Sequence, residues 1–369
     1  MKKSVLLFLT IMFINIQAQT ESIPLLKDVF KDKFYIGNAP SDYIIKGNDQ
    51  KALEILAEQH NSITAENVMK WESVHPQPGK YNFEAADRFI EFGLKNDMYI
   101  IGHTLVWHSQ TPRWVFQDAN GNPETREGLI AKMEEHITTV MSRYKGKVKA
   151  WDVVNEAFNE DGTLRSSPWQ KIIGDDFIKI AFQIANKVDP DAKLIYNDYN
   201  LCFKAKREGC IKYIKSLLDE GVKIDAIGEQ GHWDMVSPKN EEIVGFFEDV
   251  KKIGLKAMIT ELDINVLPNP WNFTGADVSV NFAARPDANP YTEGLPDSVE
   301  TKHAEKYAEV FSIFLEYQDI LDRVTFWGVH DGHSWKNNFP VRGRTDYPLL
   351  FDRQYQPKKA FYSIIDLVK

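Results

Sequence analysis

The sequence of 369 residues contains only two cysteines, Cys202 and Cys210. So few cysteines exclude a small domain held together by several disulfides. In an oxidising compartment the two could close one small loop, and we expect this disulfide, with two unpaired thiols as the alternative. Neither cysteine has a partner at the spacing of a zinc site, so no metal ligand set is predicted here.

Long apolar runs are also lacking. The longest, Val5 to Ile16, is too short to span a bilayer. It follows Lys2 and Lys3 and precedes small and polar residues around Ala18, which is the layout of a secretory signal peptide. We therefore expect residues 1–19 to be a signal peptide, residues 20–369 to be the mature chain, and the protein to be secreted or periplasmic, with no membrane span after cleavage.

The chain has no excess of positive charge, since its net charge is −9. This balance argues against nucleic acid and anionic membranes as partners. It is compatible with a neutral polysaccharide, without indicating one.

A glycine-rich phosphate-binding turn is missing as well, which disfavours a doubly wound nucleotide-binding sheet. Eight apolar strand patterns, each followed by an amphipathic helical pattern, instead predict an α/β fold of the (β/α)₈ barrel type in a single domain. The expected strands are Phe34–Ile36, Ser62–Glu66, Met98–Gly102, Val148–Val154, Lys193–Tyr196, Ile224–Ile227, Lys256–Thr260 and Arg323–Gly328.

A long segment, Asn265 to Ser298, follows the seventh expected strand and is rich in Pro, Asn and Asp. Loops of this length are uncommon unless they serve a site or are disordered. We interpret it as an insertion in the wall of a cleft, carrying Trp271, Phe273 and Tyr291, with disorder as the alternative.

Two of the expected strands end in acidic residues. The fourth runs through Trp151 into Asn155 and Glu156, and the seventh runs through Met258 into Glu261 and Asp263. In a barrel of this kind the reacting groups lie where strands enter the following loops. Two glutamates at such positions indicate glycoside hydrolysis, which uses a pair of carboxyl groups.

These stretches resemble glycoside hydrolase family 10, the endo-1,4-β-xylanases. The resemblance covers roughly Leu25 to Lys369 and includes further motifs in the family's order: Thr64-Ala65-Glu66-Asn67, Lys70-Trp71, Gly102 to His108, Gln230-Gly231-His232, Thr260 to Asp263, and Phe326-Trp327-Gly328. It implies a retaining mechanism on xylan or xylo-oligosaccharides without a cofactor or metal. Glu156 would be the general acid and base, and Glu261 the nucleophile.

The resemblance also assigns supporting residues. His232, oriented by Asp263, would hydrogen-bond the nucleophile, and Asn155 and Gln230 would approach the sugar at the reacting carbon. Glu66, Asn67, Lys70, His103 and Trp107 would bind sugars on the non-reducing side of the cut. Trp327 and Trp335 would wall the −1 sugar, and Tyr199 would stack on the +1 sugar. Turn, cap or core-packing roles are the structural alternatives for several of these residues.

One residue departs from the family pattern, because Glu229 stands where an apolar residue is usual. Strand alternation points it away from Gln230 and toward the helices, where a buried charge needs a partner.

Three other functions remain open. A β-1,4-glucanase on the same barrel is the nearest alternative, and a non-catalytic glycan-binding protein is another. A metal-dependent barrel hydrolase is the third, and it would use His103, His108, His232, His330 and His333. We expect the protein to be a monomer.

Overall fold

Eight parallel strands form a closed barrel in the computed structural model, which describes residues 23–369. The predicted signal peptide lies outside the described residues. Neighbouring strands follow the order β6-β5-β4-β3-β2-β1-β9-β8, and β8 pairs with β6 to close the ring. The strands are β1 Tyr35–Asn38, β2 Ser62–Thr64, β3 Tyr99–Trp107, β4 Ala150–Asn155, β5 Lys193–Asp198, β6 Ala226–Glu229, β8 Lys256–Asn265 and β9 Leu321–Phe326.

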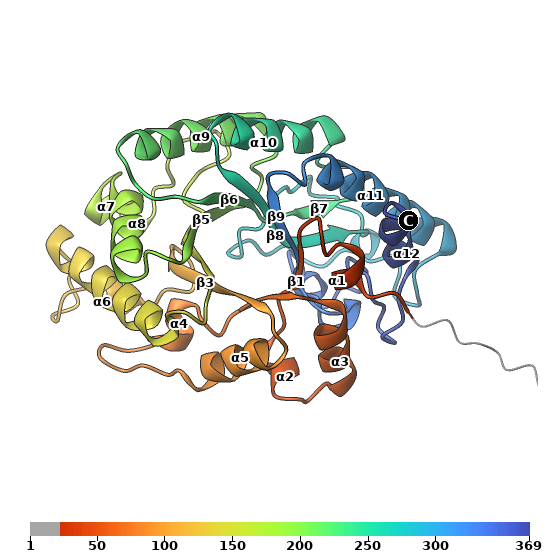
Figure 1. The fold of residues 1–369 in the computed structure, drawn as a ribbon, viewed down its shortest axis with the longest axis horizontal. Coiled ribbons are helices and arrows are strands. Elements are labelled where there is room, and N and C mark those ends of the chain that lie inside the picture. Colours follow the sequence, from red (N-terminus) through yellow and green to blue (C-terminus); the bar gives the residue numbers. More distant parts are fainter. Residues whose placement is uncertain (1–22) are drawn as a thin grey trace, which may run out of the picture.

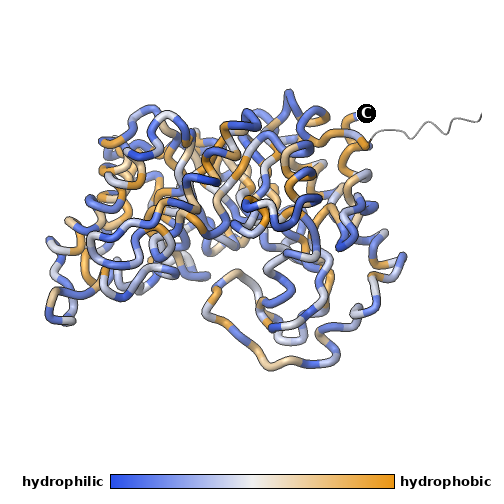
Figure 2. Tube along the Cα trace, turned by 90° about the horizontal axis from the view of Figure 1, so that it is seen from below, coloured by the Kyte–Doolittle hydropathy of each residue, from blue (hydrophilic) through white to orange (hydrophobic). Residues whose placement is uncertain are grey.

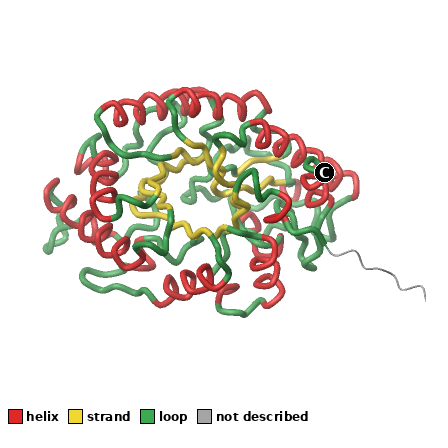
Figure 3. The backbone as a smooth tube through the Cα atoms, viewed as in Figure 1, coloured by secondary structure: helices red, strands yellow, loops and turns green. Residues whose placement is uncertain are grey.

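Helices surround this ring of strands (Figures 1 and 3). They are α1 Leu26–Val29, α2 Asp42–Ile45, α3 Gln50–Gln59, α4 Trp71–Val74, α5 Glu84–Lys95, α6 Arg126–Tyr144, α7 Pro168–Ile173, α8 Phe177–Val188, α9 Lys204–Asp219, α10 Asn240–Lys252, α11 Asp297–Glu316 and α12 Lys359–Asp366. The predicted single-domain (β/α)₈ barrel is confirmed. None of the described helices combines the length and the apolar character that crossing a membrane would need.

The apolar core lies mainly between the outer faces of the strands and the helices. A second, smaller cluster fills the barrel interior with Ile101, Ala150, Ile195, Ala226 and Met258 from five strands. Inward-facing side chains of this kind form the packed layers inside such barrels. They close the centre of the ring, so a substrate can bind only at its mouth.

Two boundaries differ from the sequence-based expectation. The amphipathic pattern that follows the fourth expected strand predicts one helix over Trp169–Val188. The structure divides it into α7 and α8, because Gly174 ends α7 with a φ of 107° that few other residues adopt. The strand expected over Lys256–Thr260 continues to Asn265, and the short β7 (His232–Asp234) pairs with this extension. The extension places His232 opposite Asp263.

The predicted disulfide is wrong, because Cys202 and Cys210 are both free and buried. Cys202 precedes α9, which begins at Lys204, and Cys210 lies six residues inside it. Six helical residues rise about 9 Å, which exceeds the Cα separation that a disulfide spans. The eight-residue spacing is therefore taken up by a helix rather than by a loop.

The insertion after β8 packs on itself at its base. Trp271 stacks on Phe282 with ring centroids 5.0 Å apart, and the Phe282 N–H donates to the Pro340 carbonyl at 2.9 Å. Long loops project from one side of the molecule (Figure 2). The insertion is thus a folded segment with its own small apolar cluster.

Candidate active site

A cleft at the carboxyl ends of the strands contains both predicted catalytic glutamates. Glu156 follows β4 and is 4% exposed, and Glu261 lies in β8 and is 5% exposed. The cleft is lined by Glu66, Asn67, Lys70, His103, Trp107, Gln110, Asn155, Glu156, Gln230, His232, Glu261, Ala276, Val278, Trp327 and Trp335. Twelve of the predicted site residues thus meet in one place.

Two side-chain amides bring the glutamates into one network. Gln230 Nε2 donates to Glu156 Oε1 at 2.9 Å, and Asn197 Nδ2 donates to Glu261 Oε1 at 2.9 Å. The same two nitrogens donate to Asn155 Oδ1, at 3.3 and 3.0 Å. Asn155 therefore links the two amides that donate to the carboxyl groups.

The environment of Glu156 favours its neutral form. Burial raises its pKa to about 7, and the charges of Asp198 and Glu261 act in the same direction. Hydrogen bonds from Gln230 and from Trp107 Nε1, which donates to Glu156 Oε2 at 2.9 Å, oppose this rise. The backbone of Glu156 has a φ of 57°, a strained conformation for a residue with a side chain.

The environment of Glu261 favours its charged form. Burial alone would raise its pKa, but the hydrogen bond from His232 and the positive charges nearby outweigh it, so the pKa is lowered. His232 Nε2 lies 3.1 Å from Glu261 Oε2, and His232 Nδ1 lies 3.0 Å from Asp263 Oδ2. Because ionised carboxylates only accept hydrogen bonds, both ring nitrogens must carry protons.

The pKa of His232 agrees with this arrangement. Burial works against a charged ring, but the carboxylates of Asp263 and Glu261 overcome it and raise the pKa. Asp263 is itself fixed by Trp335 Nε1, which donates to its Oδ2 at 2.7 Å, and by Lys336 at 3.5 Å. Asp263 therefore lies behind His232 rather than in the cleft wall.

On the other side of the cleft, Lys70 is surrounded by polar groups. Its Nζ donates to Asn67 Oδ1 at 2.9 Å and to Gln110 Oε1 at 2.8 Å, and it lies 4.9 Å from the Trp107 ring centroid. Burial lowers the pKa of Lys70 and raises that of Glu66. This group offers both donors and acceptors, which suits sugar hydroxyls.

Three residues of this network were not predicted from the sequence. Asn197 and Gln110 contact the groups described above, and Asp152 Oδ2 lies 2.9 Å from His103 Nδ1. Asp152 lies in β4 inside a stretch already recognised by motif, and Asn197 lies in β5 directly after the expected strand end at Tyr196, so their strand positions were the available signal. Gln110 lies three residues after the end of β3, and this short distance from a strand end was the only sequence feature that indicated a place in the site.

Tyr199 does not line the described cleft. The residue is 5% exposed, its OH accepts from Arg165 Nη2 at 2.8 Å, and Lys206 Nζ lies 3.7 Å from the ring centroid. Its expected stacking on a +1 sugar stays a prediction.

Glu229 is buried, as strand alternation predicted, and backbone N–H groups satisfy it. Its Oε1 accepts from the Gly231 N–H and its Oε2 from the Cys202 N–H, both at 3.1 Å. Burial raises its pKa to about 7, against the effect of these donors and of Lys206. The carboxyl thus fixes the loops after β5 and β6 without an ion pair in direct contact.

Three of the histidines considered for a metal site, His108, His330 and His333, do not line the cleft. Among the described residues, Asp49, His330 and His333 are close enough to share an ion. The Gly332 N–H donates to His330 Nδ1 at 3.2 Å, so His330 Nε2 carries the proton and donates to Asp49 at 3.2 Å. These bonds fix the turn that precedes Trp335.

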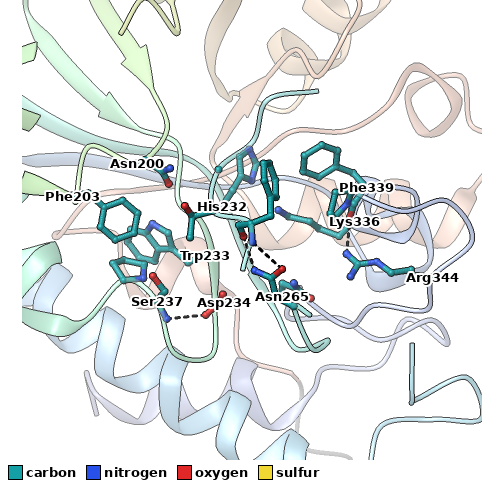
Figure 4. A pocket seen from close by; sticks show the side chains of 16 residues that line it. Asn200, Phe203, His232, Trp233, Asp234, Ser237, Asn265, Lys336, Phe339 and Arg344 are labelled. Carbon is teal, nitrogen blue, oxygen red and sulfur yellow. Dashed lines mark hydrogen bonds between the residues drawn. The ribbon is translucent and has the colours of Figure 1, made fainter. Parts of the chain in front are cut away.

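A smaller pocket adjoins the cleft and shares His232 with it (Figure 4). It lies between the β7 loop, the base of the insertion and residues 336–344, and its free volume is about 50 Å³. Ser237 N–H donates to Asp234 and Arg344 donates to the Phe339 carbonyl along its walls. The catalytic cleft has a free volume of about 150 Å³, so this pocket is the smaller of the two.

Comparisons with known proteins identify the family of the chain. The family model of glycosyl hydrolase family 10 matches residues 25–367. This chain belongs to that family. Family 10 relatives include endo-1,4-beta-xylanase A of Xylanibacter ruminicola, which is 43% identical over 367 residues and the full length of both chains. The chain is therefore a glycoside hydrolase.

Other family 10 relatives have related names. A thermostable celloxylanase of Thermoclostridium stercorarium is 37% identical over 366 residues, which cover 95% of this chain and 89% of the relative. The solved structure of a GH10 endoxylanase from a sugarcane soil metagenome has a TM-score of 0.91 and 46% identity, covering 93% of this chain and 99% of that one. This chain and that solved structure thus share the barrel fold.

Proposed function

We propose that this family 10 enzyme is an endo-1,4-β-xylanase that cleaves internal xylosidic bonds with retention of configuration. The observation that carries the proposal is the opposite tuning of two carboxyl groups in one cleft. Burial raises the pKa of Glu156 to about 7, whereas the hydrogen bond from His232 holds the pKa of Glu261 low. Such a pair supplies an acid and a nucleophile at the same pH.

In the first step the carboxylate of Glu261 attacks the anomeric carbon, and the proton of Glu156 passes to the glycosidic oxygen. The bond between this carbon and oxygen breaks, and the shortened chain leaves as an alcohol. Glu261 then holds the remaining xylosyl unit as an ester.

In the second step Glu156, now ionised, takes a proton from water. The resulting hydroxide attacks the anomeric carbon, and the ester bond to Glu261 breaks. Esterification has removed the negative charge of Glu261, which is one of the influences raising the Glu156 pKa. The pKa of Glu156 therefore falls when it must act as a base.

The remaining cleft residues suit binding of the −1 and non-reducing sugars. Gln230 Oε1 is buried and has no partner among the described residues, so it can accept a sugar hydroxyl. Trp327 and Trp335 offer apolar faces to the −1 sugar. Beyond it, Glu66, Asn67, Lys70, His103 and Trp107 supply the mixed polar groups that hydroxyls need.

Alanine variants test the two catalytic roles. Glu261→Ala should lose hydrolysis by several powers of ten, and azide should restore turnover as the glycosyl azide of inverted configuration. Glu156→Ala should retain turnover of aryl xylobiosides with good leaving groups, because these need no proton, and azide should give the retained anomer. Normal turnover of polymeric xylan by either variant would contradict the assignment.

The choice between xylan and glucan needs a direct comparison, since one relative is named a celloxylanase. We expect release of reducing ends from xylan to exceed that from carboxymethylcellulose. Release from carboxymethylcellulose alone would instead favour a β-1,4-glucanase.

The location and oligomeric state rest on sequence alone. We infer that the protein is secreted or periplasmic and has no membrane span after cleavage, because residues 1–19 have the pattern of a signal peptide. We also infer that it is a monomer. An N-terminus at residue 20 in the natural host's secreted fraction, and a monomer mass by light scattering, are the expected results.

A further inference from the structure

The tip of the insertion after β8 forms part of the cleft wall. Ala276 and Val278 line the same cleft as Glu156 and Glu261. Val278 is 45% exposed, which is unusual for an apolar residue beside a buried site. Residues Gly275–Val278, called the insertion tip below, are therefore placed to meet whatever enters the cleft.

The insertion tip also covers Tyr199. A Cβ atom on Gly275 would lie 3.0 Å from Tyr199 Cε2, so the backbone of Gly275 is in direct contact with the ring. Lys206 Nζ lies over the same ring at 3.7 Å from its centroid. Between them they leave little of the Tyr199 ring free for contact with a sugar.

Arg165 connects the insertion tip to the catalytic strands. Its Nη1 lies 3.3 Å from Asp277 Oδ2, its Nη2 donates to the Tyr199 OH, and its Nε donates to the Glu156 carbonyl at 3.1 Å. The side chains of Arg165 and Asp277 are 17% and 29% exposed. The ion pair is thus partly open to solvent, where such pairs contribute little to stability.

The base of the insertion is held more firmly than its tip. Apolar contacts of Trp271, Phe273 and Phe282, together with a backbone bond to Pro340, fix the base. The tip has Gly275 at a φ of 121° and holds Ala276 at 3% exposure, and it contacts the barrel through the Asp277–Arg165 ion pair and the packing of Gly275 on Tyr199. An outward movement of the tip would leave the apolar contacts of the base in place.

We propose that the insertion tip determines how readily a sugar occupies the leaving-group side of the cleft, and that the Asp277–Arg165 ion pair holds it over Tyr199. This inference rests on the proposed xylanase function. A xylosyl residue that leaves from the +1 position displaces the tip before it reaches the Tyr199 ring. The enzyme therefore discriminates against bulky leaving groups relative to small ones.

Asp277→Asn tests the proposal. Asp277 Oδ1 accepts from the Ser279 N–H and hydroxyl, and an asparagine keeps one oxygen for these bonds while losing the charge that pairs with Arg165. Asp287→Asn is the matched control, because Asp287 pairs with Arg285 within the same insertion at 2.7 Å. The two variants lose the same charge, but only one loses a contact with the barrel.

Two substrates separate the effect on the leaving-group side from catalysis itself. Xylohexaose must place sugars beyond the cut, whereas β-xylobiosyl fluoride has only fluoride as its leaving group. The measured quantity is the kcat/KM for xylohexaose divided by that for the fluoride. Asp277→Asn should raise this ratio about two- to fivefold, the size expected for one partly exposed ion pair, and Asp287→Asn should leave it unchanged.

A second pair of variants, one that should move the tip and one control, changes no charge. Gly275→Ala places a Cβ against Tyr199, whereas Gly294→Ala, at a similar φ of 134°, meets open space. Only Gly275→Ala should raise the ratio. An unchanged or lower ratio in both Asp277→Asn and Gly275→Ala would overturn the proposal, because the tip would then be inert or would itself bind the leaving sugar. Failure of the wild-type enzyme to release fluoride would instead refute the xylanase function.

Discussion

Gln230→Leu should move the loss of activity at high pH to a higher pH. Gln230 Nε2 donates to Glu156 Oε1 at 2.9 Å, and this bond stabilises the ionised form of the carboxyl group. Leucine is uncharged like glutamine, but its side chain has no donor and is one atom shorter. The proposed acid must be protonated to act, so activity is lost as the pH rises through the pKa of Glu156, and a higher pKa delays that loss.

The size of the shift follows from the hydrogen bond that is removed. A hydrogen bond to a charged group contributes about 1.5–3 kcal/mol, and one pKa unit corresponds to about 1.4 kcal/mol. Trp107 Nε1 remains as a donor to the other oxygen, and part of the lost bond is replaced by water. We therefore expect an increase of about one unit above the value of about 7.

The assay is the pH dependence of kcat/KM for xylohexaose, which reports the pKa values of the free enzyme. The overall rate should also fall, because Gln230 lines the cleft, so the position of the basic limb is the informative quantity. Gln110→Leu is the matched control: Gln110 also lines the cleft but bonds to Lys70 and Glu72 rather than to Glu156. A basic limb that stays in place or moves to lower pH in Gln230→Leu would refute the assignment of Glu156 as the acid.

Three further predictions concern groups around the site. Asp263→Asn removes the largest influence that raises the His232 pKa, so the imidazole ring should lose its charge. The pKa of Glu261, the proposed nucleophile, should then rise, and the acidic limb of kcat/KM should move to higher pH. Between pH 4.5 and about 7, Glu229 keeps a proton in the folded state that it loses in the unfolded chain, so the free energy of unfolding of the wild type should fall as the pH rises through this window. In Glu229→Gln this dependence should disappear. Urea unfolding should therefore show the stability difference between the two proteins changing by about 3 kcal/mol in favour of the variant between pH 4.5 and 8. Cys202 and Cys210 should both react with a thiol reagent in denaturant without reductant, and neither should react in the native enzyme. An unreacted protein whose mass is 2 Da below that of the dithiol form would show the disulfide instead.

The barrel was predictable because its signal is repeated. Each strand must be apolar on both faces when it is covered by helices outside and by packed side chains inside, and each helix needs one apolar face. Errors remained where local geometry overrides the pattern. Gly174 divides one predicted helix, and β8 continues past its apolar run because His232 and neighbouring residues of β7 pair with it.

The site was predictable where residues lie at strand ends. Twelve predicted residues meet in the cleft because strands of a closed barrel deliver their carboxyl ends to one mouth. Tyr199 shows the limit of this reasoning. Its strand predicted its position, but its exposure depends on Gly275, which lies 76 residues away in an irregular segment whose path no periodic pattern encodes.

The orientation of the catalytic amides follows from counting donors. Asn197 Nδ2 and Gln230 Nε2 each have two hydrogens, and each uses them on Asn155 Oδ1 and on one glutamate. Asn155 Oδ1 therefore accepts twice, which forces its Nδ2 toward Glu156, 3.3 Å from Oε1. Turning any one of the three amides would place two donors or two acceptors against each other. The amides thus have one consistent arrangement, which fixes the orientation of both carboxyl groups, and Asn155 is the member that accepts from both amides. The different protonation states come instead from the burial of Glu156 and from the hydrogen bond of His232 to Glu261.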